Sequence, residues 1–150
     1  MNVTITVVDY VEHEEAIRQI RDEVFIREQQ VSREDEFDGR DRNCIHVLAT
    51  AGGEAVGTGR LDLGQAGKIG RVAVLGPFRK LGIGRKMMLE LENVAREQQL
   101  DGIWFHAQLT AVSFYKRLGY QTEGDEFEEA GIRHVTMRKE FTKSEDEGIG

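Results

Sequence analysis

Short β-branched runs alternate along the chain with longer segments in which apolar residues recur at helical spacing. Residues 3–8 are mostly β-branched and predict a first strand, and residues 11–26 carry apolar side chains at the spacing of a helix. Residues 28–43 are polar and rich in acids, so we expect an irregular or short-helical connection there. A strand followed by a helix is therefore predicted to open the fold.

A hairpin and a further strand are predicted after this connection. The apolar runs 44–51 and 54–63 flank Ala51-Gly52-Gly53, a turn signal typical of an antiparallel hairpin. Residues 64–67 form a second turn signal, which leads into a strand at about 68–75.

The second half of the chain predicts two helices and three strands. Residues 83 to about 99 carry one continuous apolar face at helical spacing, and residues 103–107 predict a short buried strand. The segment around Tyr115 predicts another helix, and residues 120–127 and 133–139 predict a last hairpin. The resulting order, βαβββαβαββ, indicates an α+β fold.

Length and composition favour a single domain, which we assign to residues 1–140, followed by a frayed acidic tail at 141–150. The 27 acidic and 20 basic residues give a net charge of −7, which opposes general affinity for nucleic acid. The sequence contains no apolar run of about 18 residues and no charged-then-apolar leader, so we expect a cytoplasmic protein without membrane association.

Metal binding and cysteine chemistry are poorly supported. The histidines His13, His46, His106 and His134 do not have close ligand spacing, and Cys44 has no second cysteine with which to pair. Cys44 lies in an apolar run, where a buried inert thiol is expected rather than a nucleophile. We predict no metal site.

The acidic segment 34–41 allows two interpretations. Residues 34–39 briefly suggest a calcium loop, but the twelfth position would be Ile45 instead of a bidentate glutamate. The acids are either a solvated face or a surface that attracts a cationic amine.

The segment 71–85 joins an apolar strand to an amphipathic helix through a glycine-rich turn with the cations Arg79, Lys80 and Arg85. The first turn of a helix has free N–H groups and the positive end of the macrodipole, so it attracts a pyrophosphate. A Rossmann fingerprint or a P-loop would need other spacings. The alternative is a glycine-containing helix start with solvated cations.

Two spaced motifs resemble the GNAT N-acetyltransferase superfamily. Arg79-Lys80-Leu81-Gly82-Ile83-Gly84 is similar to its acetyl-CoA pyrophosphate loop, Arg-x-x-Gly-x-Gly. The segment 108–120 resembles its Asn-x-x-Ala-x-x-x-Tyr-x-x-Leu-Gly-Phe element, with glutamine in place of asparagine and tyrosine in place of phenylalanine. The resemblance implies a mixed, mostly antiparallel sheet of about six to seven strands, flanked by about four helices.

The resemblance also implies a cofactor, acetyl-CoA, and the residues that bind it. In the family the Val74 N–H would face the thioester oxygen, and Tyr115 would be the acid near the sulfur. The bland alternative is a tyrosine at a helix–core boundary. The implied cofactor-binding residues are Val72, Ala73, Val74, Arg79, Lys80, Leu81, Gly82, Ile83, Gly84, Arg85, Gln108, Ala111, Phe114, Tyr115 and Arg117.

For the general base we favour His134. It lies in Gly-Ile-Arg-His-Val-Thr-Met, which resembles the ending of ElaA-like acetyltransferases and the last hairpin of glyphosate N-acetyltransferase, where the histidine is the base. An imidazole with an ordinary pKa of about 6.5 suits proton removal near neutrality. A strand histidine satisfied by a neighbour is the alternative. The ElaA-like resemblance also implies that Arg27, Arg71 and His46 line the acceptor pocket, although either arginine could instead pair with acids.

We therefore predict an N-acetyltransferase that moves the acetyl group of acetyl-CoA directly to a primary amine of a small molecule or peptide. The chain has no obvious nucleophile for a covalent intermediate. A non-catalytic acyl-CoA-binding regulatory module and a nucleotide-binding fold are the rival hypotheses. Homodimers are frequent among similar enzymes, but the sequence leaves the oligomeric state open.

Overall fold

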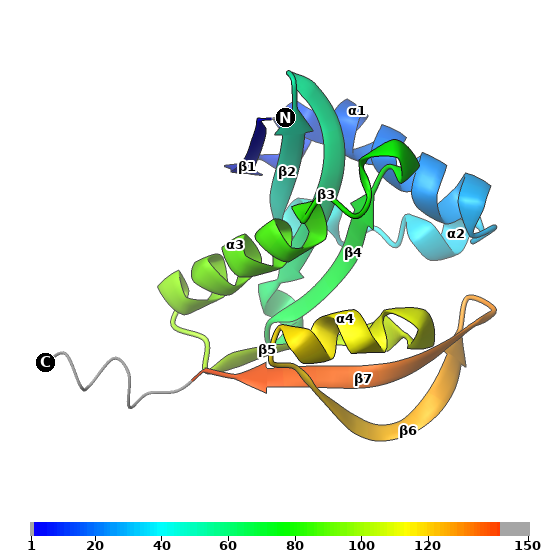
Figure 1. Ribbon diagram of the computed structural model, residues 1–150, viewed down its shortest axis with the longest axis vertical. Helices are drawn as coiled ribbons and strands as arrows, with labels where there is room; N and C mark the ends of the chain where they lie inside the picture. The colour runs from blue at the N-terminus through cyan, green and yellow to red at the C-terminus, as the bar shows by residue number, and fades with distance from the viewer. Residues whose placement is uncertain (1, 142–150) are drawn as a thin grey trace, which may run out of the picture.

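The computed structural model describes residues 2–141, and these residues build one seven-stranded sheet in the order β1-β2-β3-β4-β5-β7-β6 (Figure 1). The strands are β1 (Val3–Val8), β2 (Ile45–Ala51), β3 (Glu54–Asp62), β4 (Lys68–Val74), β5 (Gly102–Gln108), β6 (Gln121–Glu129) and β7 (Ile132–Glu140). The α-helices are α1 (Tyr10–Arg21), α2 (Arg33–Glu36), α3 (Ile83–Glu97) and α4 (Val112–Arg117). The short helical turns are η1 (Asp22–Glu28), η2 (Asp41–Asn43), η3 (Leu63–Gln65), η4 (Gly76–Phe78) and η5 (Leu109–Ala111).

The sheet divides between β4 and β5. Every neighbouring pair of strands is antiparallel except this one, which is parallel and has one register pair, Lys68 with Trp104. The Trp104 N–H donates to Gly67 O at 3.3 Å, and the two strands diverge beyond that point (Figure 1). Because β4 continues to Val74 without a ladder to β5, an open gap separates the two halves of the sheet.

Helices cover both faces of the first half. Alternate residues of a strand point to opposite faces, and Leu48 packs with α1 while Val47 and Ala49 pack with α3. The predicted helix at 11–26 ends earlier, because α1 passes at Asp22 into a π-helical segment, η1, in which the Gln29 N–H donates to Val24 O at 3.2 Å.

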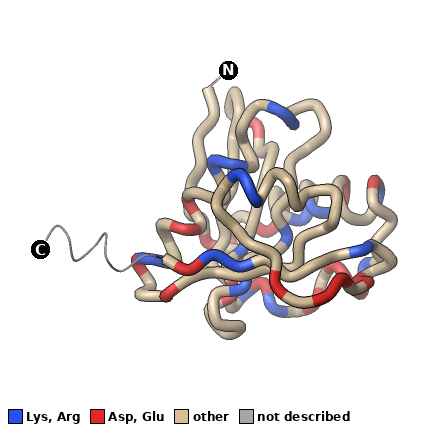
Figure 2. Tube along the Cα trace, turned by 60° about the horizontal axis from the view of Figure 1, so that its bottom comes forward, with Lys and Arg blue, Asp and Glu red and all other residues tan. Residues whose placement is uncertain are grey.

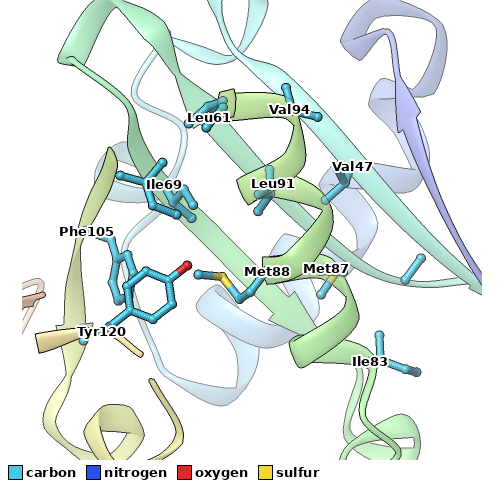
Figure 3. Packing of buried hydrophobic residues seen from close by; sticks show 14 of the residues in the cluster. Val47, Leu61, Ile69, Ile83, Met87, Met88, Leu91, Val94, Phe105 and Tyr120 are labelled. Atoms are coloured by element: carbon cyan, nitrogen blue, oxygen red, sulfur yellow. The ribbon is translucent and has the colours of Figure 1, made fainter. Parts of the chain in front are cut away.

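Helix α3 holds the main core together. Its buried side chains Met87, Met88 and Leu91 are 0% exposed and point toward the sheet (Figure 3). Beside them the Tyr120 hydroxyl donates to Glu92 Oε2 at 2.6 Å, so the carboxylate that this helix buries is satisfied. Helix α3 is therefore fixed against the sheet.

Strand β4 carries a bulge next to the gap. Between the pairs Thr58–Ala73 and Arg60–Gly70, β3 has one residue and β4 has two, Arg71 and Val72. Arg71 has φ +55°, which is uncommon for a side chain of this size and is costly unless other contacts hold it.

The other edge of the sheet, β6, is acidic and irregular. Five of its nine residues are Asp or Glu, and its register with β7 slips between Glu123 and Phe127 around Gly124, which has φ +77°. A bulge of this kind bends the strand.

Most of the predicted elements are present. The mixed, mostly antiparallel sheet with four α-helices confirms the predicted α+β fold, and the first strand, both hairpins and the short-helical connection at 28–43 are where the sequence indicates. Of the tail predicted at 141–150, residues 142–150 lie outside the described residues. Among residues 2–141, no helix is both long and apolar enough to cross a membrane.

Candidate active site

A cavity of about 500 Å³ lies where β4 and β5 diverge. Its walls come from the end of η1, from α2, from β3–β5, from α4 and from the β6–β7 turn. Six of the predicted site residues line it: Arg71, Val72, Gln108, Ala111, Tyr115 and His134. The fold therefore brings together side chains that are up to 63 positions apart in the sequence, from Arg71 to His134.

The start of α3 lies beside the same gap. The first helical hydrogen bond runs from the Lys86 N–H to Gly82 O at 3.1 Å, so the N–H groups of residues 83–85 precede the ladder. Gly82 has φ +80°, a conformation that glycine adopts readily. A Cβ at Gly84 would lie 3.5 Å from Phe114 Cζ, which places α4 next to this helix start.

The predicted basic residues of the loop fall into two groups. Arg79 is engaged, since its Nε donates to Val74 O at 2.8 Å and its Nη2 pairs with Glu28 at 2.8 Å. Lys80 and Arg85 are exposed, and Leu81 is 50% exposed. Two full positive charges therefore remain available beside the free N–H groups at the helix start.

Strand β4 directs main-chain groups into the gap. The Leu75 N–H donates to Val56 O at 2.9 Å, so Leu75 faces β3. Because neighbouring residues in a strand point their N–H groups in opposite directions, Val74 presents its N–H to the gap. Buried Ala73 packs toward α1, while Val72 and Val74 pack toward α3.

Tyr115 lies on helix α4, and its side chain lines the cavity. Its ring packs on Phe105 at 4.5 Å and on Phe114 at 5.0 Å between centroids. Within the described residues its hydroxyl makes no hydrogen bond, and burial raises the pKa of Tyr115 to about 12. The phenol therefore keeps its proton at neutral pH and has it free to donate.

His134 is buried on β7 with one ring nitrogen committed. Its Nδ1 lies 2.7 Å from Ile132 O, which requires the proton on Nδ1 and leaves Nε2 as an acceptor. Nε2 lies 4.0 Å from Glu129 Oε1. The predicted base is thus held in the tautomer that can take a proton.

A second histidine, His106, lies near His134, and the sequence analysis did not select it as a site residue. His106 on β5 lies with its Nδ1 2.9 Å from Glu129 Oε2, and its ring is 4.8 Å from that of Phe127. Alternation with buried Phe105 indicated its face, but only the pairing of β5 with β7 places it beside His134.

Gln108 bridges the cavity instead of standing free. Its Nε2 donates to Gln29 Oε1 at 2.8 Å, and Gln29 follows η1. The side chain at the position of the family's asparagine therefore ties β5 to η1. Ala111 lies on the cavity wall, and the predicted Arg117 is exposed on α4, with its Nε donating to Ser113 O at 3.3 Å.

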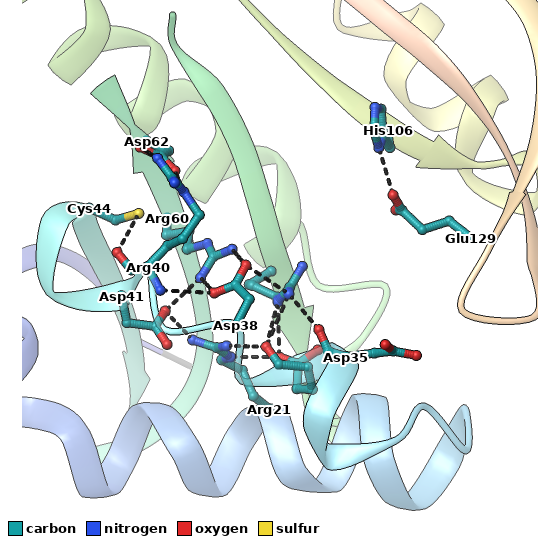
Figure 4. A network of polar contacts seen from close by, with 12 residues as sticks. Arg21, Asp35, Asp38, Arg40, Asp41, Cys44, Arg60, Asp62, His106 and Glu129 are labelled. Carbon is teal, nitrogen blue, oxygen red and sulfur yellow. Dashed lines mark hydrogen bonds and ion pairs between the residues drawn. The ribbon is translucent and has the colours of Figure 1, made fainter. Parts of the chain in front are cut away.

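A buried ionic network underlies the first half of the site (Figure 4). Arg21, 0% exposed, pairs with Glu36 and Asp41, each at 2.6 Å. Arg60 binds Asp38 at 2.7 Å and Asp41 at 2.8 Å. These pairs fix the acidic connection against β3 and α1, so the acids serve structural contacts as well as facing the cavity.

Arg71 reaches this network from the bulge in β4. Its Nε donates to Glu36 O at 3.1 Å, and its Nη2 donates to Asp35 O at 3.0 Å. These bonds hold the residue in its unusual backbone conformation. Arg71 thus lines the cavity as a clamp between β4 and α2, with its guanidinium occupied.

The two other residues predicted for the acceptor pocket lie elsewhere. His46 is 1% exposed, with its Nε2 2.8 Å from Asp41 O and its ring centre 4.8 Å from that of Tyr10 in a tilted contact, so it lies beneath the network. Arg27 has a side chain that is 71% exposed and pairs with Glu23 on the outer surface of η1. Neither is on the cavity wall.

The pKa values of two acids in this region are shifted in opposite directions. Burial raises the pKa of Glu36 despite nearby Arg71 and Arg21. Burial alone would raise the pKa of Asp38, but hydrogen bonds from Arg60 and from the Arg40 N–H hold it well below its usual range.

Cys44 matches the description of an unreactive thiol. Burial raises its pKa to about 11, and its Sγ donates to Arg40 O at 3.3 Å. Basic and acidic residues are interspersed over the chain trace (Figure 2). Among residues 2–141, no three His, Cys, Asp or Glu side chains are grouped to hold a metal ion.

The chain is similar to known acetyltransferases in sequence and in structure. The family model described as acetyltransferase (GNAT) domain matches residues 8–141. The chain is 42% identical over 129 residues to YyaT of Bacillus subtilis, which covers 83% of this chain and 87% of that protein. It is 37% identical over 123 residues to YjcF of the same organism, which is named as an uncharacterized N-acetyltransferase, and the match covers 81% of this chain and 88% of that protein.

Among solved structures, Escherichia coli ElaA superposes with a TM-score of 0.83 at 25% identity, covering 93% of this chain and all of that one. Structures that share the fold at lower identity include one crystallised with acetyl coenzyme A, at a TM-score of 0.58, and one with coenzyme A, at 0.69.

Proposed function

Because the chain belongs to the GNAT acetyltransferase family and is therefore an acyltransferase that uses acetyl-CoA, we propose that it transfers the acetyl group directly to a primary amine of a small molecule or peptide. The observation that carries the proposal is the gap between β4 and β5, with free N–H groups of α3 at one side and the unpartnered Tyr115 hydroxyl on its wall.

The residues around the gap fit coenzyme A. The N–H groups of residues 83–85, with Lys80 and Arg85 beside them, suit a pyrophosphate. The unpaired edge of β4 suits the amide-containing pantetheine arm, which can add to it as a strand would. When bound, acetyl-CoA supplies the acetyl group as a thioester.

The binding role of Arg79 is indirect in this proposal. Its guanidinium spans Val74 O and Glu28, and it thereby fixes the loop that precedes α3 against η1. Gln108 similarly fixes the end of β5 through Gln29. Both residues position the walls between which the cofactor is held.

Three groups of the chain perform the proton and hydrogen-bond work. His134 accepts a proton from the acceptor's ammonium at Nε2, because Nδ1 is committed to Ile132 O. The Val74 N–H donates to the carbonyl oxygen that faces the gap. Tyr115 carries the proton for the departing sulfur, and its raised pKa of about 12 keeps that proton in place until it is needed.

The test is release of free thiol from acetyl-CoA, followed with a thiol-reactive dye across a panel of primary amines. We expect Tyr115→Phe to lower kcat by about 10²-fold while leaving the Kd for coenzyme A within about twofold. His134→Gln should lower kcat/KM, because the variant has no imidazole nitrogen to accept the proton of the acceptor's ammonium. His13→Gln is the matched control, since His13 lies on α1 outside the cavity wall.

If both variants keep the turnover of the unmodified protein, the assigned acid and base are wrong although the family activity stands. If the unmodified protein releases thiol with no primary amine, the acceptor class is wrong.

A further inference from the structure

Lys68 lies at the narrow end of the cavity, where β4 and β5 still touch. It pairs with Trp104 in the parallel register, and its Nζ is 5.3 Å from the centre of the Trp104 ring. That ring is fixed because its Nε1 donates to Gln65 O at 2.9 Å. The Lys68 ammonium is therefore held beside Trp104, at the register position where β4 and β5 pair.

Lys68 and the two cavity histidines share one face. Ile69 on β4 and Phe105 on β5 point into the α3 core, so Lys68, Trp104 and His106 point to the opposite side. This is the side away from α3, which a second substrate can reach while coenzyme A occupies the α3 side.

Lys68 differs from the other cations on the cavity wall in having no anionic partner. Arg60 pairs with Asp38 and Asp41, and Arg71 is held by α2. Among the described residues, no carboxylate lies within 4.0 Å of the Lys68 ammonium. Burial lowers the pKa of Lys68, and attraction to Glu129 only partly opposes this.

A half-buried ammonium that lacks a partner favours a bound anion. Its aromatic neighbour is a weak substitute for a carboxylate, because a cation over a ring gains less than a charge-assisted hydrogen bond. The neutralised arginines on the same wall would compete poorly for that anion.

The position of Lys68 also sets a length. His134 pairs with Gln108, which is four residues along β5 from Trp104. At a rise of about 3.3 Å per residue, the two rows lie about 13 Å apart. An α-amino acid, whose amine and carboxylate share one carbon, is too short to lie between them.

We propose that the acceptor is an extended primary amine with a carboxylate at its far end, such as an ω-amino acid or a short peptide. Its carboxylate binds Lys68, and its amine lies beside His134 and Glu129. This assignment rests on the proposed function, because it identifies the end of the acceptor that is acetylated.

The experiment compares 6-aminohexanoate with hexylamine as acceptors, in the unmodified protein and in Lys68→Met. We expect the unmodified protein to prefer 6-aminohexanoate in kcat/KM by about tenfold, which corresponds to about 1.4 kcal/mol, and Lys68→Met to reduce this ratio to about one. β-Alanine carries the same two groups on a shorter chain, so its carboxylate should give no such increase in kcat/KM.

A binding measurement separates this inference from the proposed function. Calorimetry with the coenzyme A complex should show hexanoate binding at least tenfold more tightly than hexanamide, and Lys68→Met should remove the difference. Arg42→Met is the control, since it removes an equal charge at an exposed position off the cavity wall.

Equal kcat/KM for the two six-carbon amines, or a preference that Lys68→Met and Arg42→Met leave alike, overturns the assignment of Lys68 while acetyl transfer stands. If the unmodified protein acetylates no amine, the proposed function fails, and the hexanoate measurement still decides whether Lys68 binds a carboxylate.

Discussion

Replacing Arg60 by methionine tests whether the ionic network holds the acceptor side of the protein together. Arg60 donates three hydrogen bonds, two to Asp38 at 3.1 and 2.7 Å and one to Asp41 at 2.8 Å. The side chains of Arg60 and Asp41 are each 7% exposed, so removing the cation leaves a buried carboxylate with less compensation.

The expected loss follows from what each acid retains. Breaking a buried ion pair costs about 3–5 kcal/mol. Asp41 keeps Arg21 at 2.6 Å. Asp38 keeps the Arg40 N–H at 3.1 Å and the Arg71 guanidinium at 3.3 Å, and its side chain is 30% exposed. We therefore place the loss in unfolding free energy at the lower end, about 3 kcal/mol, or a fall in Tm of about 9 °C for a chain of this length.

Urea unfolding gives the measurement, with the midpoint expected to fall at an unchanged m-value. Arg138→Met is the control, because Arg138 pairs with Glu123 at 2.8 Å on the surface and its loss should cost less than about 1 kcal/mol. Adding Asp38→Asn to Arg60→Met should recover part of the loss. An Arg60→Met protein as stable as Arg138→Met would refute the view that the network carries net stability.

Two further predictions concern the start of helix α3 and the stability of the protein at low pH. Gly82→Ala forces a Cβ into a backbone with φ +80°, so we expect a loss of about 1–2 kcal/mol in urea unfolding and weaker binding of coenzyme A by calorimetry. Asp38 and Asp41 have pKa values below the ordinary 3.8 in the folded state. Their contribution is present above about pH 4 and disappears as the pH falls below it, so Tm should drop steeply there, and less steeply in Asp38→Asn.

The sequence predicted the secondary-structure elements well, because the spacing of apolar residues in a strand or a helix is visible within a short stretch of sequence. Residues 3–8 and the two hairpins needed only alternation and glycine turns. The π-helical turn at Asp22–Glu28 was missed, since one wide turn leaves little trace in a pattern of apolar spacing. The family resemblance selected Tyr115 and His134, and the structure shows both side chains on the wall of one cavity.

What the sequence could not supply was the partner of each charge. The acids between residues 34 and 41 appeared as a solvated face or an entrance for an amine, yet Glu36 and Asp41 are buried against Arg21 and Arg60. Lys68 showed no signal at all, because only the order of strands in the sheet places it opposite Trp104. Such pairings join distant segments, and local periodicity does not record them.

The acidic, bulged strand β6 has a consequence for behaviour at high concentration. An unpaired sheet edge invites a strand from a second molecule, and the resulting ladders can grow into insoluble fibrils. Here an incoming copy would meet like charges at five of the nine positions of β6 and a bend at Gly124. Growth from this border is therefore discouraged, and substitutions that neutralise its carboxylates should increase the tendency to precipitate.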